Sequence, residues 1–149
     1  MASEHFTVDL PQTLEQAFPD VACPARPLGN RVMVQVRRQP NVTKSGLVLV
    51  EETKETVKWN MQIARVVAMG PIAYCNRETA KPWPEGKWVK VGDYVRVPRW
   101  GGDRIEVPIQ SQVNGHVVKE EPITFVCFND HEVISLVEGD PLAIKTYIL

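Results

Sequence analysis

The residues best suited to metal binding lie near the end of the chain. Cys127 and His131 are four residues apart with Asp130 beside them, and His116 is a further imidazole close by in the sequence. A zinc site needs three or four converging ligands, usually from closely spaced Cys and His pairs. Because the chain has no Cys-x-x-Cys pair, this pattern is more typical of a core thiol beside a surface imidazole. We predict no metal and no cofactor.

Acid–base and nucleotide chemistry also lack the patterns that they need. Glu51 and Glu52 could form a carboxylate pair, but adjacent side chains on an extended chain point to opposite faces. The sequence has no Gly-x-Gly-x-x-Gly, no Gly-x-x-x-x-Gly-Lys loop, no His-Glu-x-x-His and no Gly-x-Ser-x-Gly. We predict that the protein is not an enzyme.

A mixture of basic residues and tryptophans is similar to the surfaces on which single-stranded nucleic acid stacks. Interleaved acids dilute its positive charge, and 17 Lys and Arg against 18 Asp and Glu give the chain a net charge of −1. An overall basic chain is thereby excluded, which disfavours binding of nucleic acid by bulk charge, and we expect no nucleic-acid partner. The residues of this region are Trp83, Trp88, Trp100, Lys87, Lys90, Arg96, Arg99 and Arg104.

The remaining composition indicates a protein of the cytoplasm. No apolar run approaches the ~18 residues of a membrane span, and the first residues lack the basic and apolar regions of a secretory signal. The three cysteines, Cys23, Cys75 and Cys127, form an odd and widely spaced set, which favours reduced thiols. We expect no membrane partner.

The elements that must position any site are mostly strands. Val32, Val34 and Val36 alternate with more polar residues, which is typical of a strand, and Asn114-Gly115 predicts a hairpin turn. Many short strands with frequent turns indicate an all-β fold, either a small barrel or a sandwich. Further strands are predicted at 61–67, at 87–91 and 94–97 on either side of a Gly92-Asp93 turn, at 105–107 where Pro108 confines the strand to an edge or an end, and at 123–128.

The first residues differ from the rest of the chain. Residues 1–20 hold four acids and no base, so we define residues 1–25 as an acidic N-terminal arm and 26–149 as the body. Pro11 followed by Leu14, Ala17 and Phe18 predicts one short helix. Such a short helix is marginal alone in water, so it must dock on its own chain or on a neighbour.

One apolar run stands out inside a polar stretch. Residues 47–50 are aliphatic, but they lie within residues 39–60, which are otherwise rich in Thr, Lys, Glu and Asn. Alone, such a run is most typical of a buried strand. A long polar loop with one apolar anchor instead indicates recognition of a partner, and Gly46 supplies backbone freedom before the run.

Five segments together resemble the GroES-type co-chaperonin family. They are similar to the family's opening strand, its mobile loop, the strand after that loop, its Val-Lys-x-Gly-Asp-x-Val hairpin and its closing strand. In that order the segments are Pro27–Val34, Thr43–Leu49, Ile63–Gly70, Val89–Val95 and Leu142–Ile144. The compact Ser-Gly-aliphatic loop also looks like phage-encoded members.

The resemblance implies a small GroES-like β-barrel that assembles as a ring of seven, a heptamer, and caps a GroEL-type chaperonin. The partner would bind and hydrolyse the ATP, and the pair would assist the folding of a client protein. Residues 39–60 would be the mobile loop, and residues 70–88 would take the place of the family's roof hairpin. The chaperonin-binding residues would be Gly46, Leu47, Val48, Leu49 and Val50, with Gly46 as the hinge. Leu28, Leu142, Ala143 and Ile144 would form the subunit interface.

Two alternatives remain open at this point. A GroES-like barrel could serve as a structural protein of a phage particle, a capsid cement or decoration protein found in the virion, with the apolar run as a static interface. Zinc-dependent alcohol dehydrogenases also contain a GroES-like domain, so the chain could be an enzyme fragment, although the cofactor domain and ligand set are missing from it.

Overall fold

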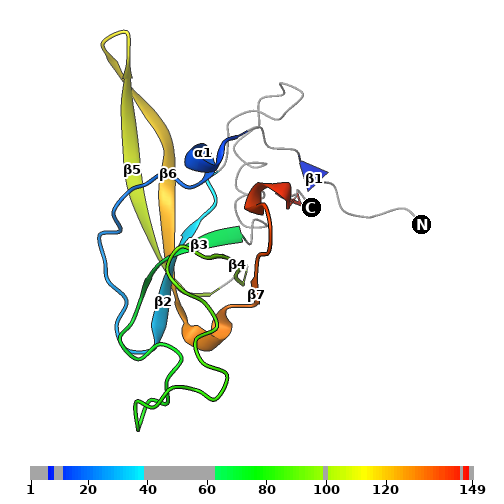
Figure 1. Cartoon of the computed structure of the whole chain (residues 1–149). Coiled ribbons are helices and arrows are strands. Elements are labelled where there is room, and N and C mark those ends of the chain that lie inside the picture. The colour runs from blue at the N-terminus through cyan, green and yellow to red at the C-terminus, as the bar shows by residue number, and fades with distance from the viewer. Residues whose placement is uncertain (1–6, 9–11, 39–62, 99–100, 145, 148–149) are drawn as a thin grey trace, which may run out of the picture.

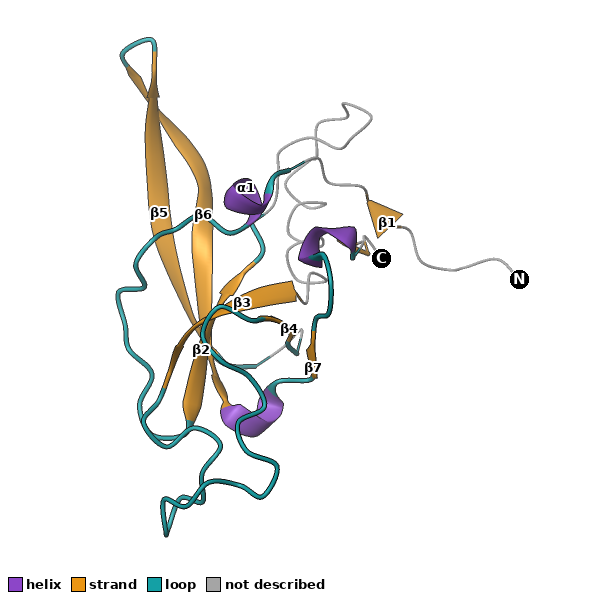
Figure 2. Cartoon of the chain, viewed as in Figure 1, coloured by secondary structure: helices purple, strands orange, loops and turns teal. Residues whose placement is uncertain are grey.

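The computed structural model describes residues 7–8, 12–38, 63–98, 101–144 and 146–147. Strands dominate them, and the only α-helix among them has four residues (Figures 1 and 2). In this part of the chain, no helix is long and apolar enough to cross a membrane. In chain order the elements are β1 Thr7–Val8, α1 Leu14–Ala17, β2 Arg31–Val36, β3 Ile63–Met69, β4 Tyr94–Arg96, β5 Asp103–Val113, β6 His116–Asn129, the 3-10 helix η1 Asp130–Glu132, β7 Ser135–Leu136, the 3-10 helix η2 Pro141–Ala143, and β8 Thr146–Tyr147.

Six strands form one antiparallel sheet in the order β5-β6-β2-β3-β4-β7, and β1 pairs with β8 in a separate two-stranded sheet. This is the arrangement expected of the predicted small β-barrel. β2 lies near the centre, where Gln35 is opposite Arg65 of β3 on one side and Phe125 of β6 on the other. The register of β2 with β3 shifts between Met33 and Val34, so the strand carries an irregularity of the kind that increases local twist.

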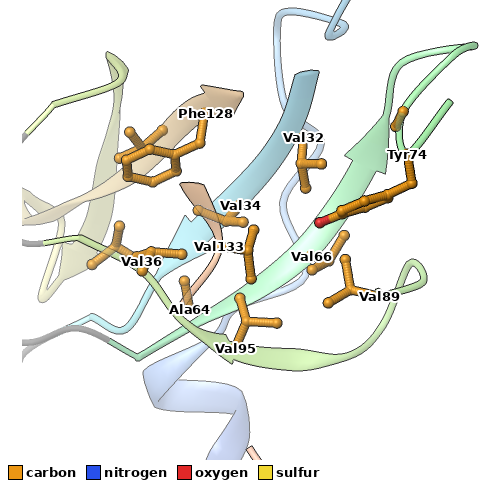
Figure 3. Close-up of a cluster of buried hydrophobic side chains, with 13 residues drawn as sticks. Val32, Val34, Val36, Ala64, Val66, Tyr74, Val89, Val95, Phe128 and Val133 are labelled. Carbon is orange, nitrogen blue, oxygen red and sulfur yellow. The ribbon is translucent and has the colours of Figure 1, made fainter. Parts of the chain in front are cut away.

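One face of the sheet encloses the main core (Figure 3). The alternating valines of β2, Val32, Val34 and Val36, all point into it, as the spacing predicts. Phe128 of β6 is the largest strand residue of this cluster and is 1% exposed. Each such side chain gains about 1.5–3 kcal/mol on burial. The other strand residues of the cluster are Ala64, Val66, Val95 and Val126.

The opposite face of β2 is buried as well. Met33 packs with Ile123 and Phe125, while Val21 and Cys23 of the N-terminal arm are half-buried against this cluster. Gln35 on the same face is fully buried, and its amide donates to the carbonyl of Pro19 at 2.8 Å. The arm therefore covers a face of the sheet that would otherwise meet water.

The predicted short helix is confirmed as α1, and it docks on its own chain. Thr13 caps its N-terminus in a capping box with Gln16, which satisfies two backbone donors. Phe18 follows the helix, is 2% exposed, and contacts the ring of Tyr94 edge-on with centroids 5.1 Å apart. Docking supplies the stability that four helical residues lack.

Three local predictions are wrong. Residues 87–90 form no strand, and only β4 follows the Gly92-Asp93 turn. Leu142–Ile144 is not the closing strand, because Asp140 caps a 3-10 helix there with Pro141 at its first turn. The strand at 105–107 does not stop at Pro108 but extends to Val113, with a register shift around the proline. The predicted position of this strand at a sheet edge is confirmed. At an edge, a residue without a backbone N–H is tolerated.

Residues 70–88, which the resemblance places at the family's roof hairpin, form an irregular hairpin with an antiparallel bridge between Cys75 and Pro82. Tyr74 is fully buried there, with the rings of Trp83 and Trp88 at 5.3 and 5.4 Å from its own. The buried carboxylate of Asp130 accepts a hydrogen bond from the Tyr74 backbone N–H at 2.9 Å. This bond and the aromatic contacts attach the hairpin to the end of β6.

The Tyr74 hydroxyl is a buried polar group within this packing. Within the described residues it has no hydrogen-bond partner, and burial, followed by the nearby charge of Asp130, raises the pKa of Tyr74 to about 12. An unfolded tyrosine ionises with a pKa of ~10. The folded state therefore binds this proton more tightly, and its contribution to stability is present below ~pH 10 and is lost as the pH rises towards 12.

We predict that Tyr74→Phe leaves the free energy of unfolding at pH 7 unchanged or raises it by about 1 kcal/mol, because the orphaned hydroxyl disappears. The variant should also lose less stability than the wild type between pH 10 and 12. Urea denaturation across this range measures both effects, with the half-buried Tyr94→Phe as control. A loss of more than about 1 kcal/mol at pH 7 would show that the hydroxyl has a partner.

Candidate functional site

The five predicted chaperonin-binding residues, Gly46 to Val50, lie outside the described residues. So do Glu51 and Glu52 of the carboxylate hypothesis, and Arg99 and Trp100 of the nucleic-acid hypothesis. What the structure does describe is the place on the sheet from which the segment 39–62 departs and to which it returns. This place is the end of β2 and the beginning of β3.

The two ends of that segment are joined to each other. The backbone N–H of Arg37 donates to the carbonyl of Ile63 at 3.1 Å, and the N–H of Arg38 donates to the carbonyl of Ala17 in α1 at 2.7 Å. The Arg38 side chain also donates from Nε to the carbonyl of Glu121 on β6 at 3.1 Å. The base of the segment is therefore fixed by β3, by the arm and by β6.

Arg37 is the central residue of this base, and its side chain is almost fully buried. Its Nε donates to Oε1 of Gln12 at 2.7 Å, and its Nη1 donates to the carbonyl of Ile144 at 3.2 Å. Burial lowers the pKa of Arg37, and the carboxylate of Asp140 opposes this shift. Arginine nevertheless stays protonated in proteins, so one buried cation joins the arm to the C-terminal segment.

The predicted interface residues lie in two different places. Leu28 is 60% exposed in the turn before β2. That turn closely approaches Gly70, where a Cβ would collide with the Gly29 carbonyl oxygen. Leu142 and Ile144 are half-buried beside Phe18, and Ala143 between them is exposed. The structure therefore leaves Leu28 and Ala143 open to water.

The candidate metal ligands near Asp130 do not form a metal site among the described residues. His131 is 64% exposed, Asp130 is buried and Cys127 is half-buried on β6, where burial raises the pKa of its thiol. The described part of the chain contains no group of three or more Cys, His, Asp and Glu side chains that could hold an ion. Asp130 has a structural role instead, since it accepts from the N–H groups of Tyr74 and His131.

The two described tryptophans of the nucleic-acid hypothesis, Trp83 and Trp88, pack against each other and against Tyr74. The rings of Trp83 and Trp88 contact each other with centroids 5.3 Å apart, and both contact Tyr74. These contacts lie within the 70–88 hairpin, although Trp88 remains 37% exposed. Sequence reasoning missed this cluster, and it also missed the buried role of Arg37, because neither has a recognisable spacing along the chain.

We predict that Arg37→Met lowers the free energy of unfolding by about 2–3 kcal/mol, because the half-buried oxygens of Gln12 and Ile144 lose a charged donor. Cleavage of the arm by a protease should also become faster. Chemical denaturation and limited proteolysis measure these effects, and Arg77→Met in the exposed turn of the 70–88 hairpin is the matched control. Equal stability of the two variants would contradict the bridging role of Arg37.

Comparison with known proteins gives one consistent result. The model of the family described as "Chaperonin 10 Kd subunit" matches residues 24–134. A protein named co-chaperonin GroES from Caldicellulosiruptor saccharolyticus is 35% identical over 82 residues, which are 55% of this chain and 77% of that protein. The one from Acetivibrio thermocellus is 37% identical over 81 residues, 54% and 77% of the two chains. The one from Staphylococcus aureus is 31% identical over 113 residues, 76% of this chain and 98% of that protein.

Proposed function

Since the chain belongs to the chaperonin 10 family, and is therefore a co-chaperonin and not an enzyme, we propose that it caps a GroEL-type chaperonin through the apolar triplet Leu47, Val48 and Leu49. Gly46 acts as the hinge before the triplet, and Val50 extends it. The observation that carries this proposal is the match to the chaperonin 10 family, together with the aliphatic run in the otherwise polar residues 39–60. The base of segment 39–62, where the Arg37 N–H donates to the carbonyl of Ile63, would hold the two ends of the segment together. The triplet enters a groove between two helices of the chaperonin, which binds and hydrolyses the ATP.

The energetics of such a contact favour a cap that binds reversibly. Burying three aliphatic side chains gains roughly 5–8 kcal/mol. Ordering about five loop residues costs on the order of 5–10 kcal/mol at ~1–2 kcal/mol each. One loop therefore binds weakly, whereas several loops on one ring bind together through their high effective concentration. A cap that must repeatedly leave its partner needs this balance.

The ring itself, which we propose to be a heptamer in the cytoplasm, needs a contact between copies of the chain. Leu28 is an exposed large aliphatic residue in a turn that closely approaches Gly70, and burying its side chain against a neighbouring subunit would gain free energy. We propose that Leu28 of one subunit packs against Leu142, Ala143 and Ile144 of the next. This contact is heterologous, so it closes into a ring when the rotation between subunits allows.

The two alternatives have no comparable support. The relatives described above are co-chaperonins and not particle proteins. The family match is to a chaperonin subunit, and the described residues offer no zinc ligand set like that of an alcohol dehydrogenase.

We predict that Val48→Asp abolishes capping and leaves the ring intact, because a charge in an apolar groove costs several kcal/mol at each of several sites. Co-elution with a chaperonin in the presence of ATP measures capping, and the native mass of the variant alone measures the ring. Val42→Asp, a valine of the same segment outside the triplet, is the control. A Val48→Asp ring that still caps would refute the role of the triplet.

We predict that Leu28→Asp shifts the native mass from ring to monomer and leaves the thermal midpoint of unfolding of the monomer within about 5 °C, since Leu28 is mostly exposed within one chain. Analytical ultracentrifugation measures the mass. Val117→Asp, a residue with 61% exposure, is the matched control and should remain a ring. An intact ring of the Leu28 variant would remove this residue from the interface.

A further inference from the structure

The hairpin of β5 and β6 continues far beyond the sheet (Figures 1 and 2). β2 pairs with β6 only from Phe125 to Asn129, but β6 begins at His116. At ~3.4 Å per residue, the nine residue steps from Phe125 back to His116 extend about 30 Å past the last pair with β2. Figure 1 shows the resulting two-stranded ribbon standing clear of the other elements.

The outer half of this ribbon has no third strand beside it among the described residues. Its base is packed, because Val107 and Ile109 are half-buried in the cluster that contains Ile123. Residues 110–119, which we call the ribbon tip, pair only with each other among the described residues. A two-stranded hairpin without a third strand or a core is marginally stable in water. A ribbon tip of this length therefore indicates that a second protein contacts and stabilises it.

The end of the sheet past which the ribbon extends indicates which protein it contacts. β6 is antiparallel to β2, so the ribbon continues past the same end of the sheet at which β2 ends at Val36 and segment 39–62 departs. The side chain of Arg38 joins the two features directly through its bond to the carbonyl of Glu121. The 70–88 hairpin lies at the other end of the sheet, beyond Met69 and near Asp130. The ribbon tip therefore lies on the side of the molecule that the proposed function turns towards the chaperonin.

We propose that the ribbon tip is a second contact with the chaperonin ring, beside the contact of the triplet. This inference rests on the proposed capping function. The contact surface is the turn Asn114-Gly115 with His116 and Val117, all exposed, and Val117 is a 61% exposed aliphatic residue of the kind that an apolar surface accepts. The tip projects from a packed base, so it meets the chaperonin at a fixed distance from the base of segment 39–62. The contact is thus a rigid one that complements the tethered triplet.

A shortened hairpin tests this proposal without disturbing the fold. Deleting residues 110–113 and 116–119 joins Ile109 and Glu120, which are directly paired, through the existing Asn114-Gly115 turn. Asn114 and Gly115 both have positive φ, at 52° and 80°, so they keep a two-residue hairpin turn in the shortened protein. The base that packs around Ile123 remains.

We expect the shortened protein to form the same ring as the wild type and to bind the chaperonin with ATP at least tenfold more weakly, because the loss is repeated at every subunit. Val117→Lys should weaken binding in the same direction. Ile134→Lys, a residue with 60% exposure at the opposite end of β6, is the control and should bind like the wild type. Native mass and calorimetric titration of the full-length ring with the chaperonin measure these effects.

A photo-crosslinking residue at position 117 gives a second measurement that does not depend on shortening. We expect an ATP-dependent crosslink to the chaperonin subunit from position 117 and none from position 134. Wild-type affinity of the shortened ring, or crosslinks from position 117 only to another copy of this chain, would overturn the proposal while leaving the capping function standing. Failure of the wild-type ring to bind the chaperonin at all would instead overturn the proposed function, and this inference with it.

Discussion

Strand β2 is buried on both of its faces, and the rest of the molecule is arranged around that requirement. One face carries the valines of the main core, and the other carries Met33 and Gln35. A barrel wall normally leaves its outer face to water, but here the N-terminal arm covers it through Val21 and Cys23. The amide of Gln35 is satisfied by the carbonyl of Pro19, so even the polar group on this face depends on the arm.

This double burial also explains how a binding segment can be attached to a rigid base. Arg37 follows β2, and its buried guanidinium contacts the arm through Gln12 and the C-terminal segment through Ile144. Gln12 of the arm and Ile144 of the C-terminal segment thus meet at the point from which segment 39–62 departs. Residues 1–23 precede the part of the chain that matches the chaperonin 10 family, so the covering arm is an addition to the matched region. The long β5–β6 ribbon departs from the same end of the sheet.

Much of the fold could be predicted because its signals are local. The alternation of Val32, Val34 and Val36, the Asn114-Gly115 turn and the helix around Ala17 each depend on neighbouring residues alone. The covering of Met33 by the arm could not be predicted, since it pairs residues distant in sequence. Pro108 indicated either an edge or the end of a strand, and the structure has the edge, where a register shift lets the strand continue past the proline. The Val-Lys-x-Gly-Asp pattern suggested two strands, and only the second, at Tyr94, has a partner strand. Of the candidate sites, the exposure of Leu28 fits an interface residue, whereas the triplet of segment 39–62 rests on the sequence and the family resemblance.

The account depends on an aliphatic triplet on a fixed base that inserts into a second protein. The native mass of the particle, measured alone and after mixing with a GroEL-type chaperonin and ATP, tests this most directly. We predict a ring of this chain alone and, with ATP, a larger particle whose mass is the sum of one chaperonin assembly and one or two such rings. A chaperonin and a ring that remain separate at every nucleotide state would contradict it.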